Sequence, residues 1–381
     1  MPWGDEGVTK LQYKQDSVTA WGSIGAPKSV PVTKAGIIKN LRMIQGGGAL
    51  TLGGGAVASI RGPYNAYTRH ELMANSQQAI FGTSGYGMFL IECVKRGLEQ
   101  GLPPRNTTLG SPPSVTDQEY VFDGRDVTAP TSYNSGTANT QWNWSLNLPV
   151  SQLIRSLGGD IGQIPMSTEN AQLSYNFTPF AASVSGTTYT IGIASATDDL
   201  NTPYNSSSST TIAAPSLDLM RIMYEPVLNE ADFPNFDFVS QWLEEQPATF
   251  SGTTFTWKQN QDAGVLARLI FGVYTSTAPF GIGTDKLTNA AALQLSYNTD
   301  IPKFKENGLE ALARQRDQLG FDLPQGFFMY DLLGPDLTLS DVMNTYVVPA
   351  IQLQMTYTSV TLNTSINPIV IAQRFLPIRV A

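Results

Sequence analysis

The sequence of 381 residues has very little of the side chains on which most catalytic and metal sites depend. It contains one cysteine, Cys93, and one histidine, His70. A single cysteine excludes an intrachain disulfide framework, and one histidine with one cysteine cannot supply a His-rich or thiolate metal site. We therefore expect no disulfide-stapled fold, no metal centre and no cofactor.

Charged residues are also scarce, at 14% of the chain against roughly 25% in an average soluble protein. The net charge of −8 argues against direct nucleic-acid binding, because phosphate contacts need clustered Lys and Arg. The start shows no secretion signal, and no apolar run reaches the roughly 20 residues that a membrane-spanning helix needs. These features are typical of a protein that folds in a reducing cytosol.

What the chain has instead is alternation with a period of two. Every second residue is apolar in two distant stretches, 142–148 and 351–357, and in a shorter one at 173–177. This period puts the apolar side chains on one face of a strand and the polar ones on the other. Short strands separated by Gly and Pro turns predict β-sandwiches. The apolar positions of the two long stretches are Trp142, Trp144, Leu146, Leu148, Ile351, Leu353, Met355 and Tyr357.

Two amphipathic helices interrupt the strands. Apolar residues recur on a 3.6-residue period over 86–98, which predicts a helix that Thr83 or Ser84 can cap. Cys93 lies on its apolar stripe, so we expect a buried small hydrophobe and not a reactive thiol. A second helix is predicted with Asp300 as its N-cap and Pro302 in its first turn. Shorter helices are predicted at 151–157 and 339–343, and a loop at 195–215.

The order of elements repeats along the chain. Each half has strands, one amphipathic helix, a Pro-containing loop and more strands, which predicts an all-β protein of two tandem sandwiches with a few short helices. We predict an N-terminal arm at 1–33, a first sandwich at 34–229 and a second at 246–381. Residues 230–245 are predicted to be a packed connector, because flexible linkers carry few aromatic residues.

Charge is unevenly placed along the chain. Residues 1–42 hold six basic and three acidic residues, a net charge of +3. Because the whole chain has a net charge of −8, residues 43–381 carry −11. A basic arm ahead of an acidic body can touch an anionic membrane surface or an acidic neighbour. Trp3, Lys10 and Lys14 are the arm residues that we predict to face a membrane; an ordinary solvated terminus is the alternative.

Motifs that would indicate an enzyme have simpler explanations. Thr68-Arg69-His70-Glu71 fits a helix capping box better than a catalytic base. Gly53-x-Gly55-x-x-Ala58 nominally matches a dinucleotide fingerprint, but Gly62-Pro63 interrupts the helix that such a site needs. The acid pairs Asp198-Asp199 and Glu244-Glu245 are adjacent, so in a strand they would point to opposite faces. We therefore predict no catalytic residues.

Four short motifs occur in order along residues 34–381. Thr83-Ser84-Gly85-Tyr86 opens the first helix and Leu148-Pro149 ends a Trp-rich strand. Ile164-Pro165 leads into 172–177, and Leu323-Pro324-Gln325-Gly326-Phe327-Phe328 follows the second helix. Together they resemble the double jelly-roll major capsid proteins of tailless phages with an internal membrane, the tectivirus type. The loop at 195–215 and the Gly-rich stretch at 46–55 find no clear counterpart there.

The resemblance implies two tandem eight-stranded jelly rolls and a virion coat subunit. Three such chains form a homotrimeric, pseudo-hexagonal capsomer that tiles an icosahedral shell around an internal membrane, which the N-terminal arm faces. Implied partners are other copies of the chain, vertex or penton proteins, minor capsid proteins and the membrane. Synthesis and assembly in the host cytoplasm follow from the same resemblance.

Two other classes of protein stay open. A carbohydrate-binding or glycoside-hydrolysing β-sandwich protein predicts a groove with exposed aromatic residues and a carboxylate pair. A phage tail or spike protein would usually show fibrous repeats or coiled-coil heptads, and the sequence contains neither.

Overall fold

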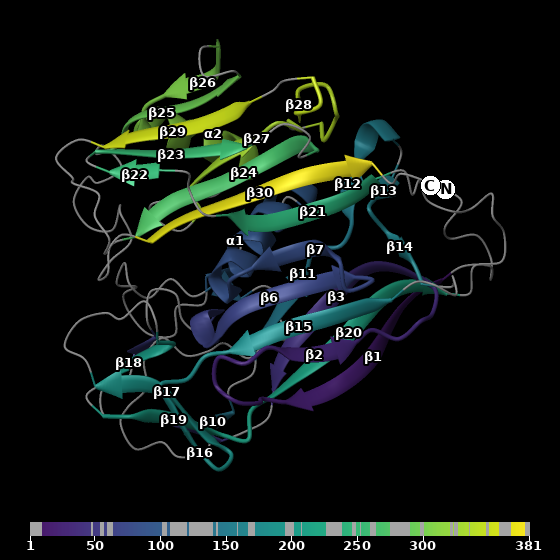
Figure 1. Ribbon diagram of the computed structural model, residues 1–381, viewed down its shortest axis with the longest axis vertical. Helices are drawn as coiled ribbons and strands as arrows, with labels where there is room; N and C mark the ends of the chain where they lie inside the picture. The colour runs from purple at the N-terminus through teal and green to yellow at the C-terminus, as the bar shows by residue number, and fades with distance from the viewer. Residues whose placement is uncertain are drawn as a thin grey trace. The chain divides into compact units, whose positions relative to one another are not determined.

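Strands dominate the structure, which is a computed structural model (Figure 1). By their contacts the residues form two units, each described by itself. Unit 1 comprises Met1–Glu92, Pro104–Gln152 and Asp160–Phe236; unit 2 comprises Cys93–Pro103, Leu153–Gly159 and Asp237–Ala381. The structure describes residues 10–46, 49–53, 57–58, 64–100, 105–106, 120–121, 140–141, 144–157, 159–166, 172–194, 202–206, 208–225, 238–245, 249–251, 253–259, 264–274, 290–297, 301–320, 323, 327–334, 336–347, 350–357 and 367–377.

Unit 1 is built from antiparallel strands whose side chains alternate between core and surface. One sheet has the order β1-β20-β3-β11, with β14 also on β3, and another runs β2-β15-β6-β7. A third has the order β10-β4-β19-β17-β18-β5, with β16 on β17, where β17 and β18 are parallel. The bounds are β1 Lys10–Ala20, β2 Lys28–Pro31, β3 Ile37–Gly46, β4 Ala49–Thr51, β5 Val57–Ala58, β6 Tyr67–Ala74, β7 Gln78–Thr83, β10 Thr140–Gln141, β11 Trp144–Leu148, β14 Ile164–Pro165, β15 Leu173–Pro179, β16 Ser183–Ser185, β17 Thr188–Ala194, β18 Tyr204–Ser206, β19 Thr210–Ala213 and β20 Ser216–Glu225.

Unit 2 has two sheets around one apolar core. Its strands run in the orders β21-β30-β24-β27, with β28 on β24, and β22-β23-β29-β25-β26. Phe255, Trp257 and Leu353 from the second sheet pack with Phe271 and Tyr330 from the first, so the unit is a sandwich. The bounds are β21 Phe238–Glu245, β22 Thr249–Ser251, β23 Thr254–Gln259, β24 Val265–Tyr274, β25 Ala290–Tyr297, β26 Ile301–Glu306, β27 Phe327–Asp331, β28 Met343–Asn344, β29 Ile351–Tyr357 and β30 Asn367–Pro377.

The remaining described elements are short strands and helices. Two two-stranded ribbons occur, β8 with β9 and β12 with β13. Their bounds, with those of the helices, are β8 Arg105–Asn106, β9 Tyr120–Val121, β12 Gln152–Ile154, β13 Gly159–Ile161, η1 Tyr64–Ala66, α1 Gly85–Lys95, η2 Arg96–Gln100, η3 Arg155–Leu157 and α2 Gly308–Leu319.

The first predicted helix is confirmed as α1. Ser84 caps it, since its Oγ accepts a hydrogen bond from the Gly87 backbone N–H at 3.1 Å. Cys93 is buried, as its place on the apolar stripe predicts. The residues at 142–148, 173–177 and 351–357 form β11, β15 and β29 where the structure describes them, and β15 and β29 bury every second side chain.

Gly85, the first residue of α1, has no room for a side chain. A Cβ there would lie 2.0 Å from the Tyr64 carbonyl oxygen and 2.8 Å from that of Tyr67, both fixed backbone atoms. Gly85→Ala should therefore cost about 3 kcal/mol or more of the free energy of unfolding, measured by urea titration. Gly46→Ala is the matched control, because nothing lies within 4 Å of its Cβ position. Equal losses in the two variants would contradict this account.

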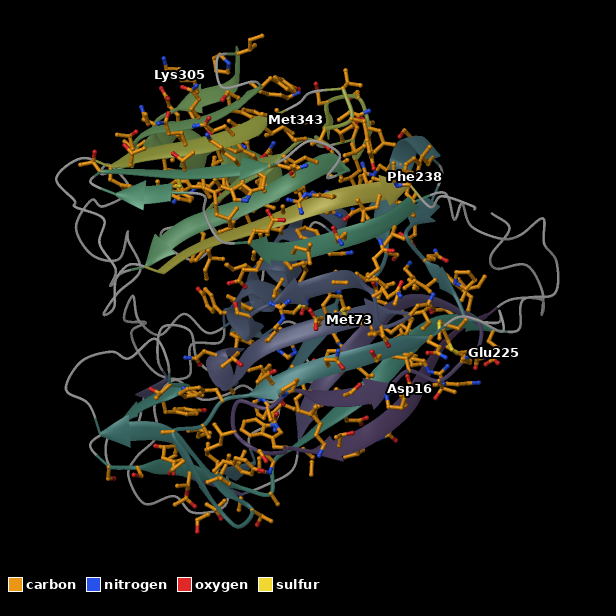
Figure 2. The ribbon with its side chains drawn as sticks, in the orientation of Figure 1. Asp16, Met73, Glu225, Phe238, Lys305 and Met343 are labelled. Carbon is orange, nitrogen blue, oxygen red and sulfur yellow. The ribbon has the colours of Figure 1, made fainter. Side chains whose placement is uncertain are left out.

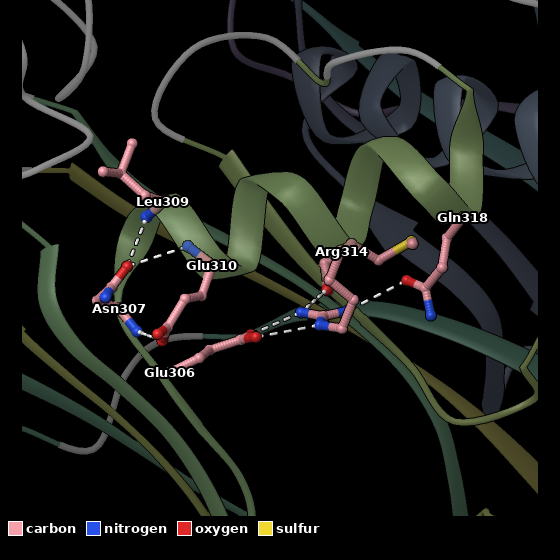
Figure 3. Close-up of polar contacts among 7 residues, drawn as sticks. Glu306, Asn307, Leu309, Glu310, Arg314 and Gln318 are labelled. Carbon is pink, nitrogen blue, oxygen red and sulfur yellow. Dashed lines mark hydrogen bonds and ion pairs between the residues drawn. The ribbon is translucent and has the colours of Figure 1, made fainter.

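The second predicted helix begins later than expected. Residues Ile301–Glu306 are the edge strand β26, in which Pro302 is tolerated, and Asn307 is the N-cap of α2. The Asn307 Oδ1 accepts hydrogen bonds from the Leu309 and Glu310 N–H groups, both at 3.0 Å (Figure 3). The Glu310 carboxylate in turn accepts from the Asn307 N–H at 2.8 Å, which completes a capping box. Asp300 as N-cap was thus wrong.

Other local predictions were also wrong. Thr68-Arg69-His70-Glu71 lies inside β6 and caps no helix, because strand pairing with β15 and β7 outweighs a four-residue cap pattern. The short helix predicted at 151–157 is confirmed only over Arg155–Leu157, the 3₁₀ helix η3, because Gln152–Ile154 form the strand β12, which pairs with β13. Residues 339–343 form no helix and reach only the short strand β28. Within 195–215, predicted as loop, the described part contains β18 and β19.

Arg314 connects helix α2 to two strands of unit 2 through hydrogen bonds and ring contacts. The Arg314 guanidinium binds both Glu306 carboxylate oxygens, at 2.7 and 3.2 Å, and donates to the Met329 carbonyl oxygen at 3.0 Å (Figure 3). It also lies over the rings of Phe304 and Tyr330, 5.2 and 5.0 Å from their centroids. These contacts join α2 to β26 and β27.

Candidate functional site

Two of the three residues predicted to face a membrane lie in β1. Lys10 and Lys14 belong to this strand, and Trp3 lies outside the described residues. β1 is the terminal strand of its sheet and pairs with β20 along its length, from Lys10 opposite Glu225 to Ala20 opposite Ser216 (Figure 1). Residues 10–20 of the predicted arm are therefore part of the sheet of unit 1.

Ion pairs hold β1 to β20. The Lys14 Nζ lies 2.5 Å from the Glu225 carboxylate, and both side chains are partly exposed. Asp16, which is labelled in Figure 2, sits at a bulge of β1. Its carboxylate is buried 2.7 Å from the Arg221 Nε. Because Glu225 balances Lys14, the strand attracts an anionic surface less than its lysines alone suggest.

Strand β1 also exposes three large apolar side chains, which is less usual than its ion pairs. Leu11, Tyr13 and Val18 are 42%, 60% and 60% exposed, although large apolar side chains generally favour burial. No sequence pattern singled them out, because Lys, Gln and Asp residues separate them and the strand resembles a polar arm. Their common place in the strand makes β1 a candidate contact surface.

The only histidine is a core residue of unit 1. His70 is fully buried in β6, and its Nδ1 lies 2.6 Å from the Tyr175 hydroxyl. The Tyr67 ring is 4.8 Å away, centroid to centroid. Burial lowers the pKa of His70 to about 3, so the imidazole is neutral near pH 7. A residue enclosed in this way cannot reach a substrate, so His70 is not a candidate catalytic base.

A buried ion pair lies in unit 2. The Arg268 Nε donates to the Asp331 carboxylate at 2.9 Å, between the paired strands β24 and β27. Arg268 also donates to the Gln373 side chain at 3.1 Å, and Gln373 donates to the Ser240 hydroxyl at 3.1 Å. The Arg268 and Asp331 side chains are completely buried. This network links β21, β30, β24 and β27 and is structural.

Acidic side chains do not gather into a metal site in the described part of the chain. No group of three or more His, Cys, Asp or Glu side chains there could hold a metal ion. Of the acid pairs, Asp198-Asp199 lies outside the described residues, and Glu245 binds Arg374 and the Trp257 Nε1, the latter at 2.9 Å. Among the helices that the structure describes, none combines the length and apolar character needed to cross a membrane.

Known proteins resemble the chain in structure and not in sequence. Neither a protein-family model nor a curated protein sequence matches it. The major capsid protein of Sulfolobus turreted icosahedral virus superposes with a TM-score of 0.61 at 12% identity, covering 96% of both chains. The PBCV-1 virus capsid protein gives a TM-score of 0.59 at 11% identity, covering 98% of this chain and 95% of that one. The Faustovirus major capsid protein gives 0.53 at 11% identity, covering 98% and 91%.

These neighbours are double jelly-roll major capsid proteins. The chain therefore has the double jelly-roll fold, all-β with short helices, that the resemblance in sequence implies. The fold extends over both units, because each comparison covers at least 96% of the chain.

Proposed function

We propose that the chain is a major capsid protein, a structural subunit of a virion shell without catalytic residues. The observation that carries this proposal is the likeness to viral capsid proteins along nearly the whole of both chains. The polar network and the histidine described above sit in cores and not in grooves, which favours a structural role over a glycoside hydrolase.

The subunit assembles, in this proposal, as a homotrimer. Two rolls in each of three chains give six similar sandwiches, a pseudo-hexagonal capsomer that can tile an icosahedral shell. Physical chemistry supports self-association, because the edge strands β1 and β26 present backbone groups that a neighbour can cover. The virion is the proposed location, with assembly in the host cytoplasm and contacts to vertex and minor capsid proteins.

The proposal includes an internal membrane inside the shell. The N-terminal arm faces this membrane in the proposal, with Trp3, Lys10 and Lys14 as the contacting residues. Its support is the net charge of +3 on residues 1–42, which extend past the arm to Lys34, Lys39 and Arg42. The ion pair between Lys14 and Glu225 makes Lys14 a weaker candidate for lipid contact than its charge alone suggests. Direct nucleic-acid binding is not expected of a chain with a net charge of −8.

The mass of the purified protein tests the proposal. Light scattering after gel filtration should give three times the 41.3 kDa of the chain, and electron micrographs should show hexagonal outlines. The open alternative, a carbohydrate-binding protein, predicts retention on polysaccharide columns instead. A strict monomer at high protein concentration that binds such a column would overturn the capsid role.

A further inference from the structure

Asn307-Gly308 is the only Asn-Gly dipeptide in the sequence. Asparagine is a thermolabile residue, because the backbone nitrogen of the next residue can attack the carbon of its side-chain amide. Glycine in the next position offers this nitrogen without a side chain to crowd the attack. Of the asparagines in the chain, Asn307 therefore has the neighbour that hinders loss of its amide least.

The reaction is an intramolecular displacement. The Gly308 nitrogen bonds to the Asn307 Cγ, the bond from Cγ to the side-chain nitrogen breaks, and ammonia leaves with the proton that the Gly308 nitrogen gives up. Water then opens the five-membered imide ring. Opening at Cγ gives aspartate at position 307, and opening at the backbone carbonyl carbon gives isoaspartate, in which the main chain runs through the former side chain.

The folded structure holds Asn307 away from ring closure. A nearly flat ring needs the Cα–Cβ bond of Asn307 and the C–N bond to Gly308 to eclipse one another, and the Asn307 ψ of 174° holds them apart. The Oδ1 is also fixed by the N–H groups of Leu309 and Glu310, both at 3.0 Å (Figure 3). Because the required rotation breaks these bonds, the capping box of α2 protects its own N-cap residue.

The same two hydrogen bonds have an opposing effect on the reaction. Donors on a carbonyl oxygen stabilise the oxyanion that forms during attack on the carbon. This help requires both N–H groups to stay on the Oδ1 while the ring forms. The rotation that brings the Gly308 nitrogen to Cγ turns the following backbone, and with it both donors, away from the Asn307 side chain. Protection by geometry therefore outweighs activation.

The first turn of α2 can open without the rest of the helix. Asn307, Leu309 and Glu310 are exposed, so the box that they form is open to water. The later turns are held more firmly, since Arg314 donates to the Met329 carbonyl oxygen at 3.0 Å and Leu319 is buried. Local opening of an exposed helix end needs much less free energy than global unfolding. The structure thus provides a local route by which Asn307 reaches the reactive conformation.

We propose that Asn307 is the residue at which this chain deamidates, and that the capping box of α2 sets the rate. Aspartate at this position can keep the cap, because its carboxylate accepts from the same N–H groups and suits a helix N-terminus. Isoaspartate cannot, since the extra main-chain carbon displaces the acceptor. The isoaspartate form therefore loosens the first turn of α2, next to the ion pair of Glu306 with Arg314. This inference is independent of the capsid role.

Peptide mapping by mass spectrometry, after incubation of the full chain in mildly alkaline buffer, tests the proposal. Aspartate and isoaspartate should appear at position 307 before any other asparagine reacts. Glu310→Ala removes the acceptor of the Asn307 N–H and should speed the reaction at least about threefold. Glu310→Gln is the matched control, because its amide oxygen accepts the same bond, and it should react at the wild-type rate. Earlier reaction at another asparagine, or equal rates in Glu310→Ala and wild type, would overturn the inference.

Global unfolding is the competing route to the reactive conformation. Asp331→Ala separates the two routes, because it breaks the buried ion pair with Arg268 and leaves the capping box intact. With the local route, this variant should deamidate at the wild-type rate under conditions in which circular dichroism shows it folded. Acceleration of Asp331→Ala equal to that of Glu310→Ala would show that loss of global stability controls the rate, and would refute control by the capping box.

Discussion

Replacing Asp331 with alanine is expected to cost about 3–5 kcal/mol of the free energy of unfolding of unit 2. The substitution leaves the fully buried Arg268 guanidinium without its carboxylate, and a buried charge without a counter-charge is strongly destabilising. It also removes the acceptor of the Leu333 N–H, which donates to Asp331 at 3.2 Å. Urea unfolding followed by tryptophan fluorescence measures the loss, because Trp242 and Trp257 are buried in the same unit.

The control for this prediction is an exposed ion pair. Arg69 and Glu71 lie 2.8 Å apart with side chains 52% and 24% exposed, so Glu71→Ala should change stability by less than about 1 kcal/mol. Arg268→Met combined with Asp331→Leu replaces both charges by apolar groups and should recover much of the loss. If Asp331→Ala costs no more than Glu71→Ala, the buried pair does not hold β24 to β27 as described.

Acid should destabilise unit 1 through His70, with a loss of about 2 kcal/mol between pH 7.5 and pH 5 from this group alone. Burial lowers the pKa of His70 to about 3, whereas an imidazole in the unfolded chain titrates near 6.5. The stability that the neutral ring contributes is therefore present above pH 6.5 and is lost as the pH falls towards 3, because only the unfolded chain takes up the proton. Desolvation is the sole cause of this shift.

A double variant isolates the histidine. His70→Phe with Tyr175→Phe removes the imidazole and the hydroxyl that bonds to it, so no buried polar group is orphaned by the change. Because the chain has no other histidine, its stability should fall about 2 kcal/mol less than that of the wild type between the two pH values. Carboxylates contribute to both proteins alike. The same pH dependence in variant and wild type would exclude His70 as the acid-sensitive group.

Strands and their inward faces could be predicted because alternation is a local property. β15 and β29 bury every second residue, as their spacing alone indicates. The first residues of the helices were harder to predict than the strands. Asp300 and Pro302 make a plausible start, but Asn307 and Glu310 make a complete capping box, and residues 301–306 pair with β25 as a strand. Pairing of this kind depends on residues elsewhere in the chain and is invisible to local propensity.

The candidate contact surface could be predicted only in part. Lys14 was singled out by its charge, but its partner Glu225 lies 211 positions away and no local pattern connects them. The outward apolar residues of β1 and β20 lie beside one another only through the register of two strands from opposite ends of unit 1, since neither strand is continuously apolar by itself. Trp3, the remaining predicted residue, lies outside the described residues and stays a prediction.

The pairing of β1 with β20 also sets an order of events during synthesis. β1 leaves the ribosome before every other described strand of its sheet, yet its only partner among the described strands ends at Glu225. At about 5–20 residues per second, translation keeps β1 waiting for roughly ten seconds or more before its sheet can close. During that wait Tyr13 and its neighbours are open to other nascent chains on the same message, so a slower ribosome should favour premature aggregation over assembly.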